Sequence, residues 1–449
     1  ILDIPYSKNE KYDIAKDFIP TILKNNKKIF AYRTVEYLKD MGTPDRLRHV
    51  EEDIKSGVVS SRSNITSRKA LFIDRDGTII EDCNHLSNPK KVRLLDGASD
   101  ALKKINKSDY LSICMTNQPV VARGECSLET LDKIHAKMDH LLGLDESYLD
   151  DLYFCPHHPH KGFDREIASL KRNCHCRKPK IGMIKKAEKD HNISLSDSWM
   201  IGDRTSDLQT GNNFGGYNSL ILTGEAGRDK TFKIRPDLVS ENLDEAVSFI
   251  LDSFEFFDKA SREIIKNLKK RHFIFIGGCS RSGKSTLSSI LKKNLKRESK
   301  MAHILELDGH LFGNRSSQQD FKERYNKKEI LKILDKFAQK KTGYYHDKSF
   351  DHFQNCVVDH GKKKFNESDI FIIEGIVSLE IAKSFESSNF KVFVDAPLSL
   401  RKKNFINKYR RHNYEMKGIN KLWKERKASE DEYLLKEKRK VDYVFSNIK

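Results

Sequence analysis

The sequence lacks any run of 18 or more apolar residues, which excludes a transmembrane helix of ordinary length. It also lacks the basic segment followed by an apolar stretch that is typical of a secretory signal. Mean hydropathy is low, at -0.65, but 25 Phe and 15 Tyr supply apolar surface for buried cores. We therefore expect folded domains and no membrane partner. The first residue is Ile1 rather than Met, so we expect a processed N-terminus or a fragment.

Cysteine is sparse, with eight residues scattered over the chain. Three of them cluster with histidines at the spacing of metal ligands, which does not suit a disulfide framework. Reduced thiols are typical of the cytoplasm, so we expect a cytoplasmic protein.

Acidic residues are too few to balance the basic ones. Lys and Arg number 83 against 65 Asp and Glu, which gives a net charge of +18. This balance favours anionic partners, and it leaves open whether they are nucleic acids or phosphorylated metabolites.

No internal repeat or low-complexity tract organises the 449 residues, and this length predicts two to four domains. A stretch rich in Ser and Gly ends a first block, residues 1–65. Short apolar runs then alternate with helical stretches through residues 66–255 and again through residues 256–449. Strands that alternate with helices predict α/β domains with parallel sheets covered by helices on both faces.

Two acidic residues close the first apolar strand of the middle block. The segment ALFIDRDGTII places Asp74 and Asp76 at the strand end, and side chains at i and i+2 point to the same side. Two carboxylates at this spacing suit a nucleophile and a general acid/base. The pair alone leaves open the alternative of a solvated acidic turn.

Three further segments of this block carry donors, cations or carboxylates suited to a phosphoryl group and Mg²⁺: Thr116 and Asn117 in CMTNQ, Arg177 and Lys178 in CRKPK, and Asp203 and Asp207 in WMIGDRTSD. The order of the four motifs resembles that of the haloacid dehalogenase (HAD) superfamily. The resemblance implies that Asp74 forms an aspartyl-phosphate and that Asp76 is the general acid/base. It also implies that Asp74, Asp76 (through its carbonyl) and Asp203 bind Mg²⁺.

A short loop between the second and third motifs is rich in Cys and His. Its sequence FCPHHPHKGFDREIASLKRNCHCRKP contains C-x-H followed by C-x-C: Cys155, His157, Cys174 and Cys176. Four soft ligands fill a tetrahedral Zn²⁺ site and leave no open position, so we predict a structural zinc. Free thiols in a chance loop are the alternative, and three neighbouring histidines are other candidate ligands: His158, His160 and His175.

The segments CPHHP, CHCRKP, TNQPVVARG and FIDRDGT resemble the zinc-loop phosphatases that act on D-glycero-D-manno-heptose 1,7-bisphosphate. The resemblance covers roughly residues 70–225 and implies a phosphorylated sugar substrate, with histidinol phosphate as the alternative. It implies that Thr116 and Lys178 stabilise the phosphoryl group. The residues that it implies for substrate binding are Asn117, Arg177, Asp82 and His85. Two departures lie near the substrate: Pro119-Val120 where the family often has Ser-Gly, and Ile181 in place of Pro.

The first block resembles the C-terminal part of sugar-1-phosphate nucleotidyltransferases. There a strand with the pattern Y-x-D-x-GTP, here Tyr37 to Pro44, leads into a final helix. An ordinary strand, turn and helix is the alternative reading of the same residues. The resemblance covers about sixty residues and lacks a Gly-rich nucleotide loop, so we expect a remnant without nucleotidyltransferase activity.

The third block opens with a strand that runs into a phosphate-binding loop. The segment FIFIGGCSRSGKST fits G-x-x-x-x-G-K-[ST] and is followed by a helical stretch, which predicts an ATP site. Its candidate residues are Gly278, Gly283, Lys284, Ser285 and Thr286.

Two further strand ends of this block carry carboxylates. Asp308 in HILELDGH is placed to take a proton from an acceptor hydroxyl, and Glu374 in FIIEG suits the surroundings of Mg²⁺. These features resemble the uridine kinase and phosphoribulokinase group, which implies an ATP-dependent kinase of a small molecule.

Two classes of function remain. In the first, a HAD-type Rossmannoid phosphatase is fused to a P-loop kinase in the biosynthesis of nucleotide-activated heptose, with Mg²⁺, Zn²⁺ and ATP as cofactors. In the second, a kinase and a phosphatase repair nucleic-acid ends, and the net positive charge attracts the nucleic acid. The zinc loop favours the first class, as do basic residues that alternate with Glu rather than with aromatics. We therefore predict the sugar pathway and no nucleic-acid partner.

Overall fold

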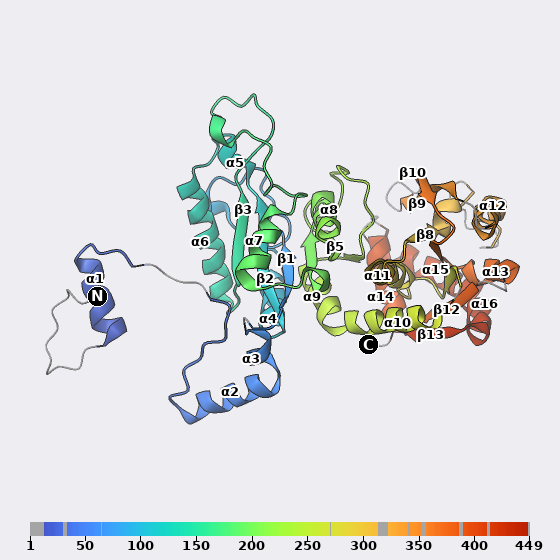
Figure 1. Ribbon diagram of the computed structural model, residues 1–449, viewed down its shortest axis with the longest axis horizontal. Helices are drawn as coiled ribbons and strands as arrows, with labels where there is room; N and C mark the ends of the chain where they lie inside the picture. The colour runs from blue at the N-terminus through green and yellow to red at the C-terminus, as the bar shows by residue number, and fades with distance from the viewer. Residues whose placement is uncertain are drawn as a thin grey trace. The chain divides into compact units, whose positions relative to one another are not determined.

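The computed structural model describes residues 13–29, 34–63, 65–269, 271–312, 322–339, 342–351, 356–385, 389–410 and 414–447. The chain forms two compact units, Ile1–Ile65 and Thr66–Lys449. Each unit has its own secondary structure (Figure 1).

The first unit is helical where it is described. It contains a π-helical turn at Ile14–Phe18 and the helices α1 (Ile19–Lys24), α2 (Pro44–Lys55) and α3 (Val58–Ser61). The Thr43 side chain caps α2 by accepting from the Arg46 amide, and Pro44 occupies the first turn. The helix expected after the Gly-Thr-Pro turn is therefore present. The strand expected before it is wrong, because residues 34–43 have no ladder partner among the described residues and form no strand.

The second unit begins with a six-stranded sheet in the order β3-β2-β1-β4-β5-β6, and all its pairings are parallel. Its strands are β1 (Lys69–Ile73), β2 (Tyr110–Asn117), β3 (Asp151–Cys155), β4 (Trp199–Gly202), β5 (Tyr217–Ile221) and β6 (Leu238–Ser240). Its helices are α4 (Ala98–Asn106), α5 (Pro119–Ala122), α6 (Leu128–Leu144), α7 (Gly182–His191), α8 (Thr205–Phe214) and α9 (Leu243–Asp252).

The strand order of this sheet reverses at β1 and β4. The chain proceeds from β1 to β2 and β3 on one side, and then returns to β4 on the other side of β1. Ile73 at the end of β1 pairs with Ile201 of β4, and the Asp74 amide donates to the Ile201 carbonyl. In open parallel sheets this switch point is where the carboxyl ends of strands form a crevice for ligands. The motifs that end β1, β2 and β4 therefore meet at one edge.

A second parallel sheet has the order β13-β12-β7-β11-β8. Its strands are β7 (Phe273–Gly277), β8 (Ala302–Glu306), β11 (Ile370–Glu374), β12 (Asn389–Asp395) and β13 (Tyr443–Ser446). The antiparallel hairpin of β9 (Gly343–Asp351) and β10 (Cys356–Phe365) stands beside it. Its helices are α11 (Lys284–Arg297), α12 (Lys327–Ala338), α13 (Ser378–Ala382), α14 (Leu398–Arg410), α15 (Met416–Arg426) and α16 (Glu432–Glu437).

One hydrophobic core runs through both sheets. Trp199 and Tyr217 of the first sheet stack at 4.8 Å and meet Phe254 edge-on. Phe254 begins α10 (Phe254–Asn267), whose buried side chains continue the same core to Ile274 and Leu287. Because α10 joins the cores, both sheets belong to one compact unit. Among the described residues, none of the helices has the length and apolar character that a membrane span requires.

Candidate functional site

Asp74 lies directly after β1 and is almost fully buried. Its Oδ1 accepts from the Arg75 amide at 2.7 Å and forms an ion pair with Lys178 Nζ at 2.8 Å. Lys178 Nζ also lies 2.6 Å from Oδ1 of Asp207, in the first turn of α8. The structure thus brings two motifs together around a buried lysine, whose pKa is raised by the two carboxylates despite the opposing effect of burial.

Asp203 follows β4 and is fully buried. Its Oδ2 accepts from the Glu225 amide at 2.7 Å, whereas its Oδ1 has no hydrogen-bond partner among the described residues. A Cβ at Gly77 would lie 2.5 Å from this carboxylate, and one at Gly224 would lie 2.3 Å from it, so only glycine leaves the space. Both loops approach Asp203 through their backbones.

Three carboxylates form a cluster in which one oxygen of each lies within 4.8 Å of the others: Asp74, Asp203 and Asp207. Burial raises the pKa of Asp74 to about 7, with Lys178 opposing the shift, and raises the pKa of Asp203 to about 8. Buried carboxylates with one lysine between them need further positive charge. The oxygen of Asp203 that lacks a partner fits Mg²⁺, which takes few hard oxygen ligands.

Asp76 lies two residues beyond Asp74, but its side chain is outside this cluster. Its Oδ2 accepts from Gln118 Nε2 at 2.8 Å, and its Oδ1 pairs with the Arg75 guanidinium at 2.9 Å. Gln118 also donates to Oγ1 of Thr116, which is buried at the end of β2. The two carboxylates of the DxD motif therefore have separate surroundings, as a nucleophile and an acid/base require.

The side chain of Asn117 forms two hydrogen bonds with the backbone of Lys178. The Asn117 side chain donates to the Lys178 carbonyl at 3.2 Å and accepts from the Lys178 amide at 3.0 Å. This geometry fixes the backbone from which the lysine side chain reaches Asp74. Contact with substrate is the expectation for Asn117, and in the structure its amide group hydrogen-bonds the backbone of Lys178.

The other residues expected to bind substrate lie among arginines. Asp82 accepts from Arg204 Nη2 at 3.1 Å, and His85 contacts Arg123 and lies 3.1 Å from Glu125. Arg123 also approaches His158, at 3.4 Å. Two arginines, Arg123 and Arg204, thus lie beside Asp82 and His85.

Arg177 is half-buried, and its Nη1 lies 3.4 Å from the His157 carbonyl. Burial lowers the pKa of its guanidinium, while the neighbouring Cys155 and Cys174 oppose the shift.

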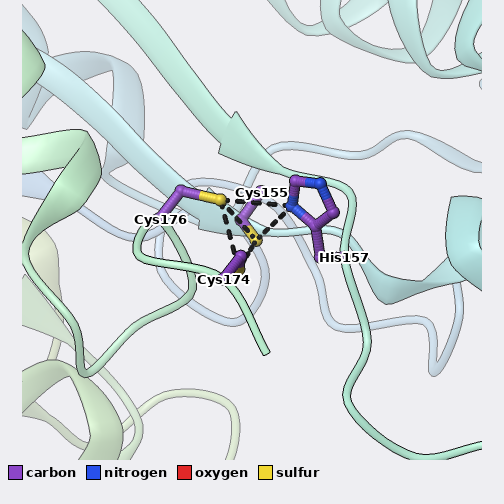
Figure 2. Close-up of side chains that lie close together, drawn as sticks. All are labelled: Cys155, His157, Cys174 and Cys176. Carbon is purple, nitrogen blue, oxygen red and sulfur yellow. Dashed lines mark hydrogen bonds between the residues drawn. The ribbon is translucent and has the colours of Figure 1, made fainter. Parts of the chain in front are cut away.

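The four residues of the Cys/His loop converge at the end of β3. Figure 2 shows Cys155, His157, Cys174 and Cys176 pointing toward one centre. The sulfur–sulfur distances are 3.1–3.5 Å, and His157 Nδ1 lies 3.2 Å from the Cys176 sulfur. Ligands of tetrahedral Zn²⁺ would stand about 3.7 Å apart, so the four donors already approach this geometry.

The neighbouring histidines are engaged elsewhere or lie outside this group. His158 Nδ1 meets the backbone of His160, and its Nε2 faces Arg123. His160 and His175 are not members of the metal-capable cluster. The structure thus brings together the four residues that the C-x-H and C-x-C spacing predicts as ligands.

The P-loop connects β7 to α11. Gly278 and Gly283 have φ of 139° and 102°, which favours glycine, and Lys284 opens the helix. The Lys284 ammonium folds over the loop and donates to the carbonyls of Gly278 and Cys279 at 3.0 and 2.9 Å. Ser285 and Thr286 follow in the first turn of α11 and line a cavity beside the P-loop.

The carboxylates expected near the P-loop lie at the ends of β8 and β11. Asp308 lines the cavity, and its Oδ1 accepts from the Tyr325 hydroxyl at 2.9 Å. Burial raises the pKa of Glu374, while Lys284 and a hydrogen bond with Ser285 oppose the shift. Arg401 of α14 is buried, pairs with Asp431 at 2.6 Å and donates to the Ser280 carbonyl of the P-loop.

Sequence reasoning missed several contacts that only the fold creates. Gln118 follows the Thr-Asn pair and could have been found from its place at the strand end. Arg75 stands between the two aspartates, and its burial gave no signal in the sequence. Arg204 and Arg123 reach Asp82 and His85 from other loops, so no local pattern identifies them.

Comparison with known proteins gives one family profile, described as HAD-hydrolase-like, which matches residues 175–246. A D-glycero-beta-D-manno-heptose-1,7-bisphosphate 7-phosphatase of Haemophilus ducreyi is 35% identical over 187 residues, or 41% of this chain and 98% of that protein.

Two solved structures are similar to parts of the chain. A D,D-heptose 1,7-bisphosphate phosphatase from B. bronchiseptica, complexed with magnesium and phosphate, is 27% identical with a TM-score of 0.36. The alignment covers 41% of this chain and 98% of that one. A possible uridine kinase from Bacillus stearothermophilus is 20% identical with a TM-score of 0.29, covering 43% and 98%.

Proposed function

The chain belongs to the D-glycero-beta-D-manno-heptose-1,7-bisphosphate 7-phosphatase family of HAD-like hydrolases, and from this premise we propose that it removes the 7-phosphate of a heptose 1,7-bisphosphate. The observation that carries this proposal is the buried pair of Asp74 and Lys178 at the switch point of the first sheet. Arg204 and Arg123, which lie beside Asp82 and His85, suit the second phosphate of a bisphosphate. A monophosphate such as histidinol phosphate would leave these arginines without an anionic partner.

In the proposed reaction Asp74 attacks phosphorus. Lys178 and the Arg75 amide hold its Oδ1, which leaves Oδ2 for the new bond. As the bond to the sugar oxygen breaks, Asp76 gives its proton to that oxygen. Asp76 then takes a proton from a water molecule, which attacks the aspartyl-phosphate and releases inorganic phosphate.

Three groups support the phosphoryl transfer. Lys178 lies beside the attacking carboxylate of Asp74, and the Thr116 hydroxyl lies at the neighbouring strand end. Gln118 holds Asp76 in place. Asp74, the Asp76 carbonyl and Asp203 would hold Mg²⁺, which when bound supplies positive charge to the phosphoryl oxygens.

The substrate class is tested by phosphate release from three compounds: heptose 1,7-bisphosphate, histidinol phosphate and a 3′-phosphorylated oligonucleotide. We expect kcat/KM for the bisphosphate to exceed that for the other two by about 100-fold, because only the bisphosphate engages both ends of the site. Equal or greater activity on the oligonucleotide would contradict the proposal and would favour repair of nucleic-acid ends.

We also propose that Cys155, His157, Cys174 and Cys176 bind a structural Zn²⁺. The four donors fill a tetrahedral site, and the ion would fix the loop that carries Arg177 and Lys178 into the phosphatase site.

Elemental analysis should find about one zinc per chain. Cys174→Ser should release the metal and lower the melting temperature, because metal binding stabilises only the folded loop. Cys356→Ser is the matched control, since this half-buried thiol lies in the β9–β10 hairpin outside the cluster, and it should keep the zinc. A folded wild-type protein without zinc would contradict the assignment.

A second activity is supported by the P-loop. Gly283, Lys284 and the carboxylates Asp308 and Glu374 line one cavity, in the arrangement that an ATP-dependent kinase needs. We propose that ATP is the donor and that Asp308 takes the proton of the acceptor hydroxyl. The kinase would make a sugar bisphosphate, and the phosphatase would then consume it. The two reactions would be consecutive steps in the synthesis of nucleotide-activated heptose.

A further inference from the structure

The cavity at the P-loop is built by both sheets of the second unit. It has a volume of about 950 Å³ and is lined on one side by residues 280–286. Another part of its lining is the connection between β5 and β6, which we call the β5–β6 segment, residues 222–237. The kinase site is therefore bounded in part by the phosphatase.

The β5–β6 segment is anchored to the helix that follows the P-loop. Asp237 accepts from the Asn218 amide at 2.9 Å and pairs with Lys293 of α11 at 2.5 Å. Lys293 also donates to the carbonyl of Gly216. These bonds hold the segment in a fixed place relative to the nucleotide site.

Arg235 projects from this segment toward the carboxylates of the kinase. Its Nη2 donates to Asp347 at 2.8 Å and to the Lys348 carbonyl at 2.9 Å, which fixes the guanidinium against the β9–β10 hairpin. Its Nη1 forms a longer ion pair with Glu306, at 3.8 Å. Its Nε is buried and has no hydrogen-bond partner among the described residues.

The charge of Arg235 acts where the acceptor would lie. Glu306 is two residues from Asp308, and burial raises the pKa of Glu306 to about 8 against the opposing charge of Arg235. The same guanidinium acts on Glu374 beside the P-loop. Asp347 already pairs with Lys363 at 2.5 Å, so Arg235 is not needed to neutralise it.

We propose that Arg235, contributed by the phosphatase, binds the phosphate of a phosphorylated sugar that is the kinase acceptor. A guanidinium that is anchored on one side by Asp347 and is partly exposed in the cavity suits a phosphate group. The inference rests on the proposed kinase activity and adds to it a residue from outside the kinase that recognises the acceptor. The acceptor hydroxyl loses its proton to Asp308, and its oxygen forms a bond to the γ-phosphorus of ATP. The bond between the γ-phosphorus and the bridging oxygen breaks, and ADP leaves.

The test measures ADP formation by the full chain with ATP and either D-glycero-D-manno-heptose 7-phosphate or the unphosphorylated heptose. An Asp74→Asn background prevents hydrolysis of the product. We expect Arg235→Ala to raise the KM for the sugar phosphate about 10- to 100-fold, because a charge-assisted hydrogen bond is lost. The KM for ATP should not change. Arg235→Lys should restore part of the affinity. Lys233→Ala, an exposed position of the same segment outside the cavity lining, should change nothing.

Three results would overturn the proposal. An unchanged KM in Arg235→Ala would exclude contact with the acceptor phosphate. An equal fall of kcat with both sugars would show that Arg235 only holds the hairpin in place. Phosphorylation of neither sugar, by a chain that binds ATP normally, would reject the acceptor class; absence of ATP binding would reject the proposed kinase itself.

Discussion

Asp74→Asn should abolish phosphate release from heptose 1,7-bisphosphate, with kcat falling about 1000-fold or more. The asparagine amide keeps the size of the side chain but cannot attack phosphorus, so the first step of the proposed reaction is lost. The fold should survive, because Lys178 retains its ion pair with Asp207 at 2.6 Å. The measurement is the release of inorganic phosphate under saturating substrate, together with a thermal melt.

Asp100→Asn is the matched control for this variant. Asp100 is exposed in the first turn of α4 and belongs to none of the strand-end motifs, so its loss should leave the rate unchanged. ATP-dependent phosphorylation should also persist in Asp74→Asn, since the P-loop lies on the second sheet. Turnover by Asp74→Asn close to the wild-type rate would reject Asp74 as the nucleophile.

Lys284→Ala should remove ATP-dependent phosphorylation while it spares the phosphatase. Lys284 is the P-loop cation, and losing one preorganised charge at a phosphoryl group costs about 100- to 1000-fold in rate. In the structure its ammonium is held by the carbonyls of Gly278 and Cys279, from which it can turn to the nucleotide phosphates. The measurement is ADP formation, with phosphate release from the bisphosphate assayed on the same preparation.

The matched control is Lys296→Ala, an exposed lysine near the end of the same helix. It removes the same charge from α11 without touching the loop, and both activities should remain. Loss of both activities in Lys284→Ala would contradict independent chemistry at the two sites. Undiminished ADP formation in Lys284→Ala would exclude the P-loop as the ATP site.

The strand ends were the part of the molecule that the sequence predicted best. Asp74, Thr116 and Asp203 each follow or end an apolar run, and parallel strands bring their carboxyl ends to one edge. The sequence also predicted that the four Cys and His residues of the loop lie together, because this spacing is typical of metal ligands. Local signals were enough where the chemistry sits on consecutive residues of one element.

Contacts between distant segments were not predictable in this way. Gln118 reaches Asp76 across two strand ends, and Arg204 reaches Asp82 over more than a hundred residues. Arg235 lies in a loop whose sequence carries no motif, and only the packing of α10 and α11 brings it to the second sheet. The strand expected around Tyr37 was wrong: the Tyr37 hydroxyl instead hydrogen-bonds Asp53 of α2 at 2.5 Å.

The most direct test of the central claim is to follow heptose 1,7-bisphosphate by phosphorus NMR as the full chain acts on it, with Asp74→Asn as the blank. We predict that the signal of the 7-phosphate disappears and that of inorganic phosphate grows equally, while the 1-phosphate signal persists. Loss of the 1-phosphate first, or no reaction while another phosphate ester is hydrolysed, would contradict the assignment as a heptose-bisphosphate 7-phosphatase.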